Sequence, residues 1–376
     1  MNTRSLVTNL SLAVGMILLI SNVSFAPPPA RVRTLPGVEK GQLESRWLSP
    51  YVLVRTERIG SASTTSVRWF KENGKLIHEL SGQSIYASPG FVSDAQTIHA
   101  VNGDWKFVLP KKPGPAGYIT ATTDSRTFLH EFHPQERQVA VDIYIRGKLA
   151  NTVGPFHQYR AESVQLSGDG SAAILVWRGA EQKRLQVVVT GPDGKTRFQR
   201  DCIAPAHAPV AAPGANGALV KPNTGDAKEF DFVYYPKAGK SAPFHVGSNA
   251  KFVDWVPDST KVLISSSVGE AEHFHLVQCT TGETVWSIPD PNPRPGMCCA
   301  AIAVKKYILF HGHDFAAVDS ETGRMIARWK PDGHRRPIGV NGAWFRKLGK
   351  KFFVVADNEF AEARLEDIAA KKNGWR

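Results

Sequence analysis

Two short histidine-containing segments hold the side chains of this sequence that could do chemistry. His273 and His275 lie two residues apart, and so do His311 and His313, which Asp314 follows directly. Residues two apart share one face of a β-strand, so each segment would present two imidazoles together if it is a strand. Imidazoles and carboxylates bind zinc, copper or iron, and they can also move protons at a ligand mouth. The candidate metal ligands are therefore His273, His311, His313 and Asp314.

Regularly spaced turns indicate which elements position these segments. From about residue 47 to residue 367 the sequence consists of short β-type runs broken by Gly, Asp, Asn and Pro, with almost no helical periodicity. A turn glycine, usually followed by a polar or charged residue and then an apolar run, recurs at Gly74, Gly103, Gly147, Gly194, Gly239, Gly282 and Gly323. The last six are 41 to 47 residues apart, which is the length of a four-stranded unit.

A second series of turns keeps a fixed phase with the first. It lies about 24 residues upstream in each unit, at Asp124, Asp169, Asn216 and Asp258. A four-stranded sheet cannot bury both faces alone, whereas stacking such sheets around an axis covers them. The sequence therefore predicts an all-β protein, a β-propeller of four-stranded blades, with seven blades first, six as the alternative and two smaller β-domains after that.

The predicted ring needs a closing blade. We expect the C-terminal strands in residues 342–356 to join the hairpin in residues 66–80, so that N- and C-terminal strands close the propeller. This joining would explain why Gly74 and Gly103 are only 29 residues apart.

The distance of each histidine segment from its turn glycine indicates where the segment lies in the blade. His273 lies nine residues before Gly282, and Asp314 lies nine residues before Gly323, so the two would be equivalent in adjacent blades. Both positions fall near the loop between the second and third strands, at the same end as the loops between blades. We therefore expect a basic ligand-binding mouth at this end, formed by Arg294, His311, His313, Arg335 and Arg336.

The two best-defined repeats resemble a known family. Residues 318–323 read Val-Asp-Ser-Glu-Thr-Gly and precede Trp329, and residues 279–282 read Cys-Thr-Thr-Gly and precede Trp286. Both look like the third-to-fourth-strand turn of quinoprotein-like (PQQ-like) and related WD40/YVTN-type propeller repeats, over about residues 260–332. The resemblance implies a secreted propeller, and many propellers of this kind are binding modules. It specifies a blade and no activity, so the cofactor is left unknown.

Tryptophans and cysteines complete the candidate list. Large indole rings in or beside the repeat strands are expected to pack between blades, at Trp69, Trp105, Trp286 and Trp329. The cysteines are Cys202, Cys279, Cys298 and Cys299, which permit disulfides without requiring a disulfide scaffold. The adjacent pair could form a vicinal ring, as in some quinoprotein alcohol dehydrogenases that it resembles. Alternatively, one member pairs with Cys279 or stays reduced.

The N-terminal residues indicate export. Residues 1–26 contain an eleven-residue apolar run at 10–20, which is the length of a signal-peptide core and too short to span a bilayer unaided. Pro27 disfavours cleavage at Ala26, so an uncleaved N-terminal anchor is the alternative to a secreted or periplasmic protein. We assign residues 27–46 to a Pro-rich tether, 47–367 to the propeller and 368–376 to a basic tail.

The net charge and the missing catalytic motifs limit the classes of function that the sequence allows. The chain has 46 Lys and Arg against 34 Asp and Glu, a net charge of +12, which favours acidic partners. We find no nucleophile elbow and no Walker loop. The sequence therefore indicates an exported binding or scaffold module for a protein or an anionic polymer, with nucleic acid not expected and a membrane only if the N-terminal segment stays uncleaved. The alternative is a metal-assisted hydrolase or lyase, or a quinoprotein-like oxidoreductase, that uses the histidine cluster.

Overall fold

Short antiparallel strands form most of this protein. The structure, a computed structural model, describes residues 31–34, 45–48, 52–58, 64–70, 75–82, 85–88, 91–94, 97–100, 105–110, 119–122, 125–157, 164–178, 184–223, 230–269, 271–291, 300–304, 306–311, 315–329, 344–348, 351–356 and 359–364. For the described residues of 31–58 and 344–364, only the backbone is described.

Four consecutive strands form each unit of the first half. The first unit contains β2 (Ser45–Leu48), β3 (Val52–Arg58), β4 (Thr64–Phe70) and β5 (Leu76–Gly82). The second contains β6 (Ile85–Ser88), β7 (Phe91–Asp94), β8 (Thr97–Ala100) and β9 (Lys106–Val108). The third contains β10 (Ile119–Ala121), β11 (Thr127–Phe132), β12 (Gln138–Ile145) and β13 (Lys148–His157). The fourth contains β14 (Val164–Leu166), β15 (Ala172–Arg178), β16 (Arg184–Thr190) and β17 (Thr196–Asp201).

The second half repeats the pattern. The fifth unit contains β18 (Val210–Ala211), the 3-10 helix η1 (Pro213–Ala215), β19 (Gly217–Val220), β20 (Phe232–Pro236) and β21 (Ala242–Phe244). The sixth contains β22 (Ser248–Trp255), β23 (Lys261–Val268), β24 (Ala271–Gln278) and β25 (Glu283–Pro289). The seventh contains β26 (Ala300–Val304), β27 (Tyr307–His311), β28 (Phe315–Asp319) and β29 (Met325–Trp329). The eighth contains β30 (Trp344–Leu348), β31 (Lys351–Ala356), β32 (Glu359–Arg364) and β1 (Arg31–Thr34).

Within the described residues the strands pair into seven sheets, the number of blades that the sequence predicts. Six of these sheets have four strands. The seventh sheet has eight, because the third and fourth units are joined by one residue pair, His157 on β13 with Trp177 on β15. The described chain therefore holds eight four-stranded units in seven sheets.

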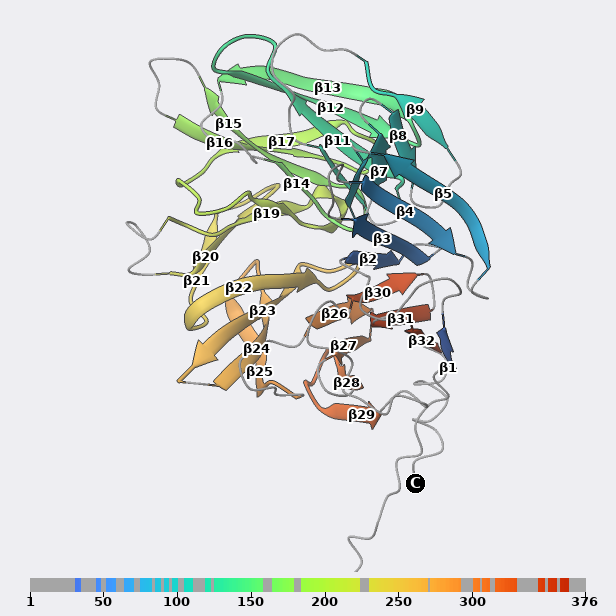
Figure 1. The fold of residues 1–376 in the computed structure, drawn as a ribbon. Coiled ribbons are helices and arrows are strands. Elements are labelled where there is room, and N and C mark those ends of the chain that lie inside the picture. The colour runs from blue at the N-terminus through green and yellow to red at the C-terminus, as the bar shows by residue number, and fades with distance from the viewer. Residues whose placement is uncertain are drawn as a thin grey trace, which may run out of the picture.

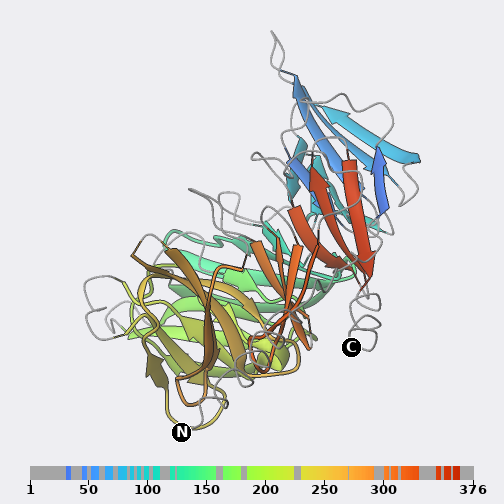
Figure 2. The same cartoon turned by 90° about the horizontal axis from the view of Figure 1, so that it is seen from below.

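The units follow one another around an axis in chain order. The first strands of neighbouring units lie side by side, as β22 does with β26 and β26 with β30, and β2 of the first unit lies beside β30 of the eighth. Figure 1 shows this circuit from blue through green and yellow to red, and Figure 2 shows the red strands next to the blue ones. The prediction of an all-β propeller of four-stranded blades is confirmed.

Antiparallel succession gives the propeller two distinct ends. The turns between first and second strands and between third and fourth strands lie at one end, which we call the turn end. The loops between second and third strands and between units lie at the other, which we call the loop end. The fourth strands are the exposed outer edges, as the largely exposed residues of β5, β13 and β17 show.

The structure corrects two expectations about the chain ends. Residues 66–80 and 342–356 do not join, because each segment pairs with its own neighbours in sequence, β4 with β3 and β5, and β30 with β31. Instead β1 pairs antiparallel with β32, with Arg31 opposite Glu362. Strand β1 lies inside residues 27–46, which the sequence assigns to a tether, because its backbone pairs with β32. Residues 1–30 and 365–376, with the leader and the basic tail, lie outside the described residues.

Neighbouring units are locked at the turn end by their turn glycines. A residue on the outer strand of one unit, or directly before it, packs against the third-to-fourth-strand turn of the next. This occurs at four joints: Trp105 on Gly147, Ala150 on Gly194, Phe244 on Gly282 and Trp286 on Gly323. At Gly323 the backbone φ is +68°, and a Cβ atom would lie 3.0 Å from the indole ring of Trp286. The Trp286 Nε1 also donates a hydrogen bond of 3.2 Å to the carbonyl of Ser320 in the same turn. Both the positive φ and the close packing require glycine here.

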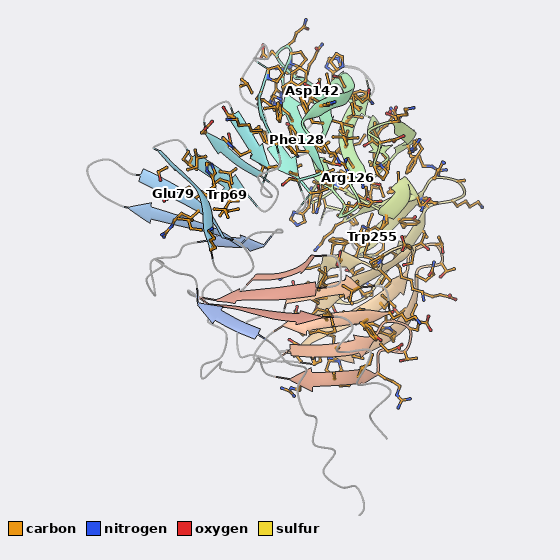
Figure 3. All side chains as sticks on the ribbon, turned by 90° about the vertical axis from the view of Figure 1, so that its right-hand side faces the viewer. Trp69, Glu79, Arg126, Phe128, Asp142 and Trp255 are labelled. Atoms are coloured by element: carbon orange, nitrogen blue, oxygen red, sulfur yellow. The ribbon has the colours of Figure 1, made fainter. Side chains whose placement is uncertain are left out.

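Apolar clusters fill the interfaces between units. Trp69, Val67 and Ile85 pack between the first and second units, and Phe274 and Phe310 pack between the sixth and seventh, with ring centroids 4.8 Å apart. Figure 3 shows Trp69 in the blue first unit. Burying each such side chain contributes about 1.5–3 kcal/mol.

Aromatic stacking joins the second and third units. Phe128 stacks on Tyr144 within the third unit, at 4.6 Å between ring centroids, and Trp105 of the second unit stacks on Phe128 at 5.8 Å. Figure 3 shows Phe128 and Asp142 on the green strands of the third unit. The expected packing role is confirmed for Trp69, Trp105 and Trp286, while the side chain of Trp329 lies outside the described residues.

The Gly323→Ala substitution tests the joint. It should lower the free energy of unfolding by about 2–4 kcal/mol, because it adds the cost of a positive φ to a clash with a rigid ring. Gly239→Ala is a matched control, since Gly239 has φ +95° but no atom within 4 Å of its Cβ position. It should cost only about 1–2 kcal/mol. Equal losses in chemical denaturation would contradict the packing explanation.

Candidate functional site

The described residues include only part of the predicted site. His273 lies on β24 with its side chain described, and His311 is the last residue of β27, where its backbone pairs with Ala300 and Phe315. The positions of Arg294, His313, Asp314, Arg335 and Arg336 lie outside the described residues, as does the side chain of His311. The metal set and the basic mouth therefore stay predictions.

His273 and His275 lie on one face of β24, as their spacing predicts. Their rings are stacked, with centroids 6.4 Å apart and an interplanar angle of 23°. Ser266 on the neighbouring strand β23 is the backbone partner of His273 and lies on the same face. The Ser266 Oγ is 2.7 Å from the His275 Nε2, and both side chains are buried.

The fifth unit adds an acid and a third histidine. Asp231 directly precedes β20, and His245 directly follows β21, so both lie at the loop end of that unit. The Asp231 Oδ2 lies 3.0 Å from the His245 Nδ1 and accepts hydrogen bonds from the backbone N–H groups of Val246 and Gly247, at 2.8 and 3.0 Å. Asp231 therefore fixes the loop that leads into β22.

The two groups form one cluster across the interface. A Cβ atom on Gly247 would lie 3.0 Å from the Ser266 Oγ, so the loop held by Asp231 lies directly against the Ser266–His275 pair. The Asp231 carboxylate also acts electrostatically on His275. We call Asp231, His245, Ser266, His273 and His275 the histidine cluster.

Electrostatics keep His275 neutral. Burial lowers the pKa of His275, the neighbouring His273 lowers it further, and the Asp231 carboxylate opposes both effects. A neutral imidazole can accept the Ser266 hydroxyl proton at Nε2. The distance of 2.7 Å between the Ser266 Oγ and the His275 Nε2 is within the range found between a nucleophilic hydroxyl and its general base. However, Ser266 is only 2% exposed, so the pair is placed to hold the loop rather than to meet a substrate.

The cluster presents one accessible group. The side chain of His245 is 68% exposed, whereas that of its partner Asp231 is 20% exposed. An imidazole held by a carboxylate can donate or accept a hydrogen bond toward a ligand at the loop end. Among the residues that the structure describes, no three His, Cys, Asp or Glu side chains are grouped so that they could hold a metal ion.

Sequence reasoning missed Asp231, His245 and Ser266. Asp231 lies eight residues before Gly239, almost the offset that singled out His273, so counting back from each turn glycine could have found it. Ser266 carries no such signal, because its role depends on the diagonal contact to His275 across a strand pair.

The cysteines are reduced where they are described. Cys202 and Cys279 have free thiols, and the adjacent cysteines of residues 298–299 lie outside the described residues. Burial, followed by the charge of Asp201, raises the pKa of Cys202 to about 12, and burial raises the pKa of Cys279. Both groups are therefore protonated thiols at neutral pH, which makes them poor nucleophiles and metal ligands.

Replacing His275 should change how stability depends on pH. The folded pKa of His275 is lowered, so the unfolded chain takes up the proton first as pH falls. The stabilisation is present above the unfolded pKa near 6.5 and is lost as pH falls toward the folded pKa. His275→Gln should therefore lose less unfolding free energy than the parent between about pH 7.5 and pH 5.

Urea titrations at the two pH values measure this difference. His207→Gln serves as a control at an exposed histidine and should keep the parent dependence. A parent-like pH dependence in His275→Gln would show that this residue does not titrate as described.

Comparisons with known proteins find similarity of structure alone, at low sequence identity. No protein-family model and no curated protein matches the chain. A chain in the crystal structure of the mitotic checkpoint complex is 12% identical, with 92% of this chain and 97% of that chain covered at a TM-score of 0.42. The β-propeller domain of the Trilobed protease from Pyrococcus furiosus is 9% identical, with 87% and 98% covered at a TM-score of 0.41. At this similarity the fold assignment stands on the strand pairing of the chain itself, and that pairing makes it a β-propeller.

Proposed function

We propose that this chain is a binding propeller for an acidic macromolecule, a protein or an anionic polymer. One observation supports the proposal most directly. The residue after the turn glycine is an exposed cation in five units, at Lys75, Lys148, Lys195, Lys240 and Arg324. The sixth described position of this series holds Glu283.

Repetition places these cations at one end of the molecule. Every third-to-fourth-strand turn lies at the turn end, beside an exposed outer strand. Charges of one sign spread around a rim attract an oppositely charged partner over several ångströms and speed its encounter. The net charge of +12 adds to this attraction.

The predicted mouth would be a separate surface. Arg294, His311, His313, Arg335 and Arg336 belong to the loop end by their place in the repeat, where His245 is exposed. It therefore has to be tested separately from the turn end. Export by residues 1–26 is likewise part of this proposal, supported by their apolar run. No helix among the described residues is long and apolar enough to cross a membrane.

We also propose that β1 closes the ring. It completes the eighth unit by pairing with β32, and β30 of that unit lies beside β2. A chain that starts at residue 35 lacks β1, so it should melt about 5 °C below a chain that starts at residue 31. Equal melting temperatures in calorimetry would show that the ring holds without this strand.

Binding to dextran sulfate tests the function, with uncharged dextran as the matched control. The full chain should bind the sulfated polymer at low salt and lose about tenfold or more in affinity as salt screens the contacts. It should not bind dextran. Equal binding to both polymers, or affinity that salt does not change, would contradict the proposal.

A further inference from the structure

The turn cations are not spread evenly around the rim. The third, fourth and fifth units carry most of them, in the turns 146–148, 193–195 and 237–240 and on the outer strand β17. We call this surface the basic arc; its cations are Arg146, Lys148, Lys195, Arg197, Arg200, Lys237 and Lys240. The turns contain one carboxylate, Asp193, and its charge is balanced by Arg197 at 2.9 Å.

Hydrogen bonds hold the three turns side by side. The Asn151 Nδ2 on β13 donates to the carbonyl of Gly194, at 2.9 Å, which ties the third unit to the turn of the fourth. The Arg200 guanidinium donates to the carbonyls of Gly239 and Lys237, at 2.7 and 3.2 Å, which ties the fourth unit to the turn of the fifth. The arc is therefore one continuous, braced surface.

The lysines of the arc are available to a ligand. Lys148, Lys195 and Lys240 are exposed, and no carboxylate of the described residues lies within ion-pair distance of them. The next two units differ in charge. The sixth has Glu283 after its turn glycine, and the seventh has exposed Glu321 in the same turn as Arg324. These carboxylates end the arc on that side.

We propose that the basic arc binds an acidic polysaccharide that runs along the rim from turn to turn. A linear polymer with repeated carboxylate or sulfate groups matches cations that occur two or three times in each unit of the arc. This inference rests on the proposed function and narrows it to one end and one ligand class.

Other acidic partners fit the arc less well. Single-stranded nucleic acid binds largely by stacking its bases on aromatic side chains, and no exposed aromatic lies among the described residues of the arc. A lipid surface needs several apolar side chains to insert beside the cations, whereas Leu149 is the one large exposed apolar residue described there.

A charge-matched pair of variants of the full chain tests the arc. The arc variant is Lys148→Gln with Lys195→Gln and Lys240→Gln, and the control variant replaces three exposed cations outside the arc, Lys106, Arg137 and Lys306, by Gln. Isothermal titration with a heparin-derived dodecasaccharide should show about tenfold weaker binding for the arc variant and less than about twofold for the control. Circular dichroism and thermal melts check that both fold like the parent.

Further measurements distinguish a failure of the proposed function from a failure of the arc proposal. If the parent chain binds none of the dodecasaccharide, dextran sulfate and polyglutamate, the proposed function fails and the arc proposal with it. If it binds polyglutamate alone, the arc proposal fails while the function stands. If the parent binds but the arc and control variants weaken equally, or only Arg335→Gln with Arg336→Gln weakens binding, the arc proposal fails while the function stands. Tighter parent binding to polyglutamate, a single-stranded oligonucleotide or vesicles with anionic lipid would overturn the assignment to polysaccharide.

Discussion

The packing of one unit against the turn glycine of the next, present at four joints of the described residues, is the contact on which the rest of this structure depends. A sheet of four strands has two faces to cover, and the neighbour covers each face only if the units meet at a fixed distance. The glycine turns set that distance, since a side chain at Gly323 would push the Trp286 ring away. Where the neighbour does not press on the glycine, as at Gly239, the guanidinium of Arg200 bonds the turn carbonyl instead. The interface clusters and the turn cations are then positioned by the same repeat.

The sequence predicts the architecture because the joint has a residue signature. Turn glycines 41 to 47 residues apart report the third-to-fourth-strand turns directly, and the structure places positive φ values at Gly147, Gly194 and Gly282. The chain ends are harder to predict, because β1 is a four-residue strand without a turn glycine and its partner β32 is distant in sequence.

Only the part of the candidate site that follows from the alternation of side chains along one strand could be predicted from the sequence. The shared face of His273 and His275 follows from alternation along β24, and their place near the loop end follows from the offset to Gly282. The hydrogen bond between Ser266 and His275 joins two neighbouring strands of the sixth unit, and the approach of Asp231 depends on how the fifth unit meets the sixth. Spacing along one strand encodes neither contact. The structure shows His275 as a buried group with a lowered pKa, and its partner Ser266 lies against the loop that Asp231 holds.

The pairing of β1 with β32 also determines how this protein would respond to a pulling force. The two strands are antiparallel, and Arg31 lies opposite Glu362, so the start of β1 and the end of β32 are at the same edge of the sheet. Tension applied through the two chain ends would therefore peel β1 away one residue pair at a time, instead of shearing all the pairs at once. Peeling requires far less force than shearing, because the hydrogen bonds break in sequence. The contact that resists such tension first is thus only four residue pairs long.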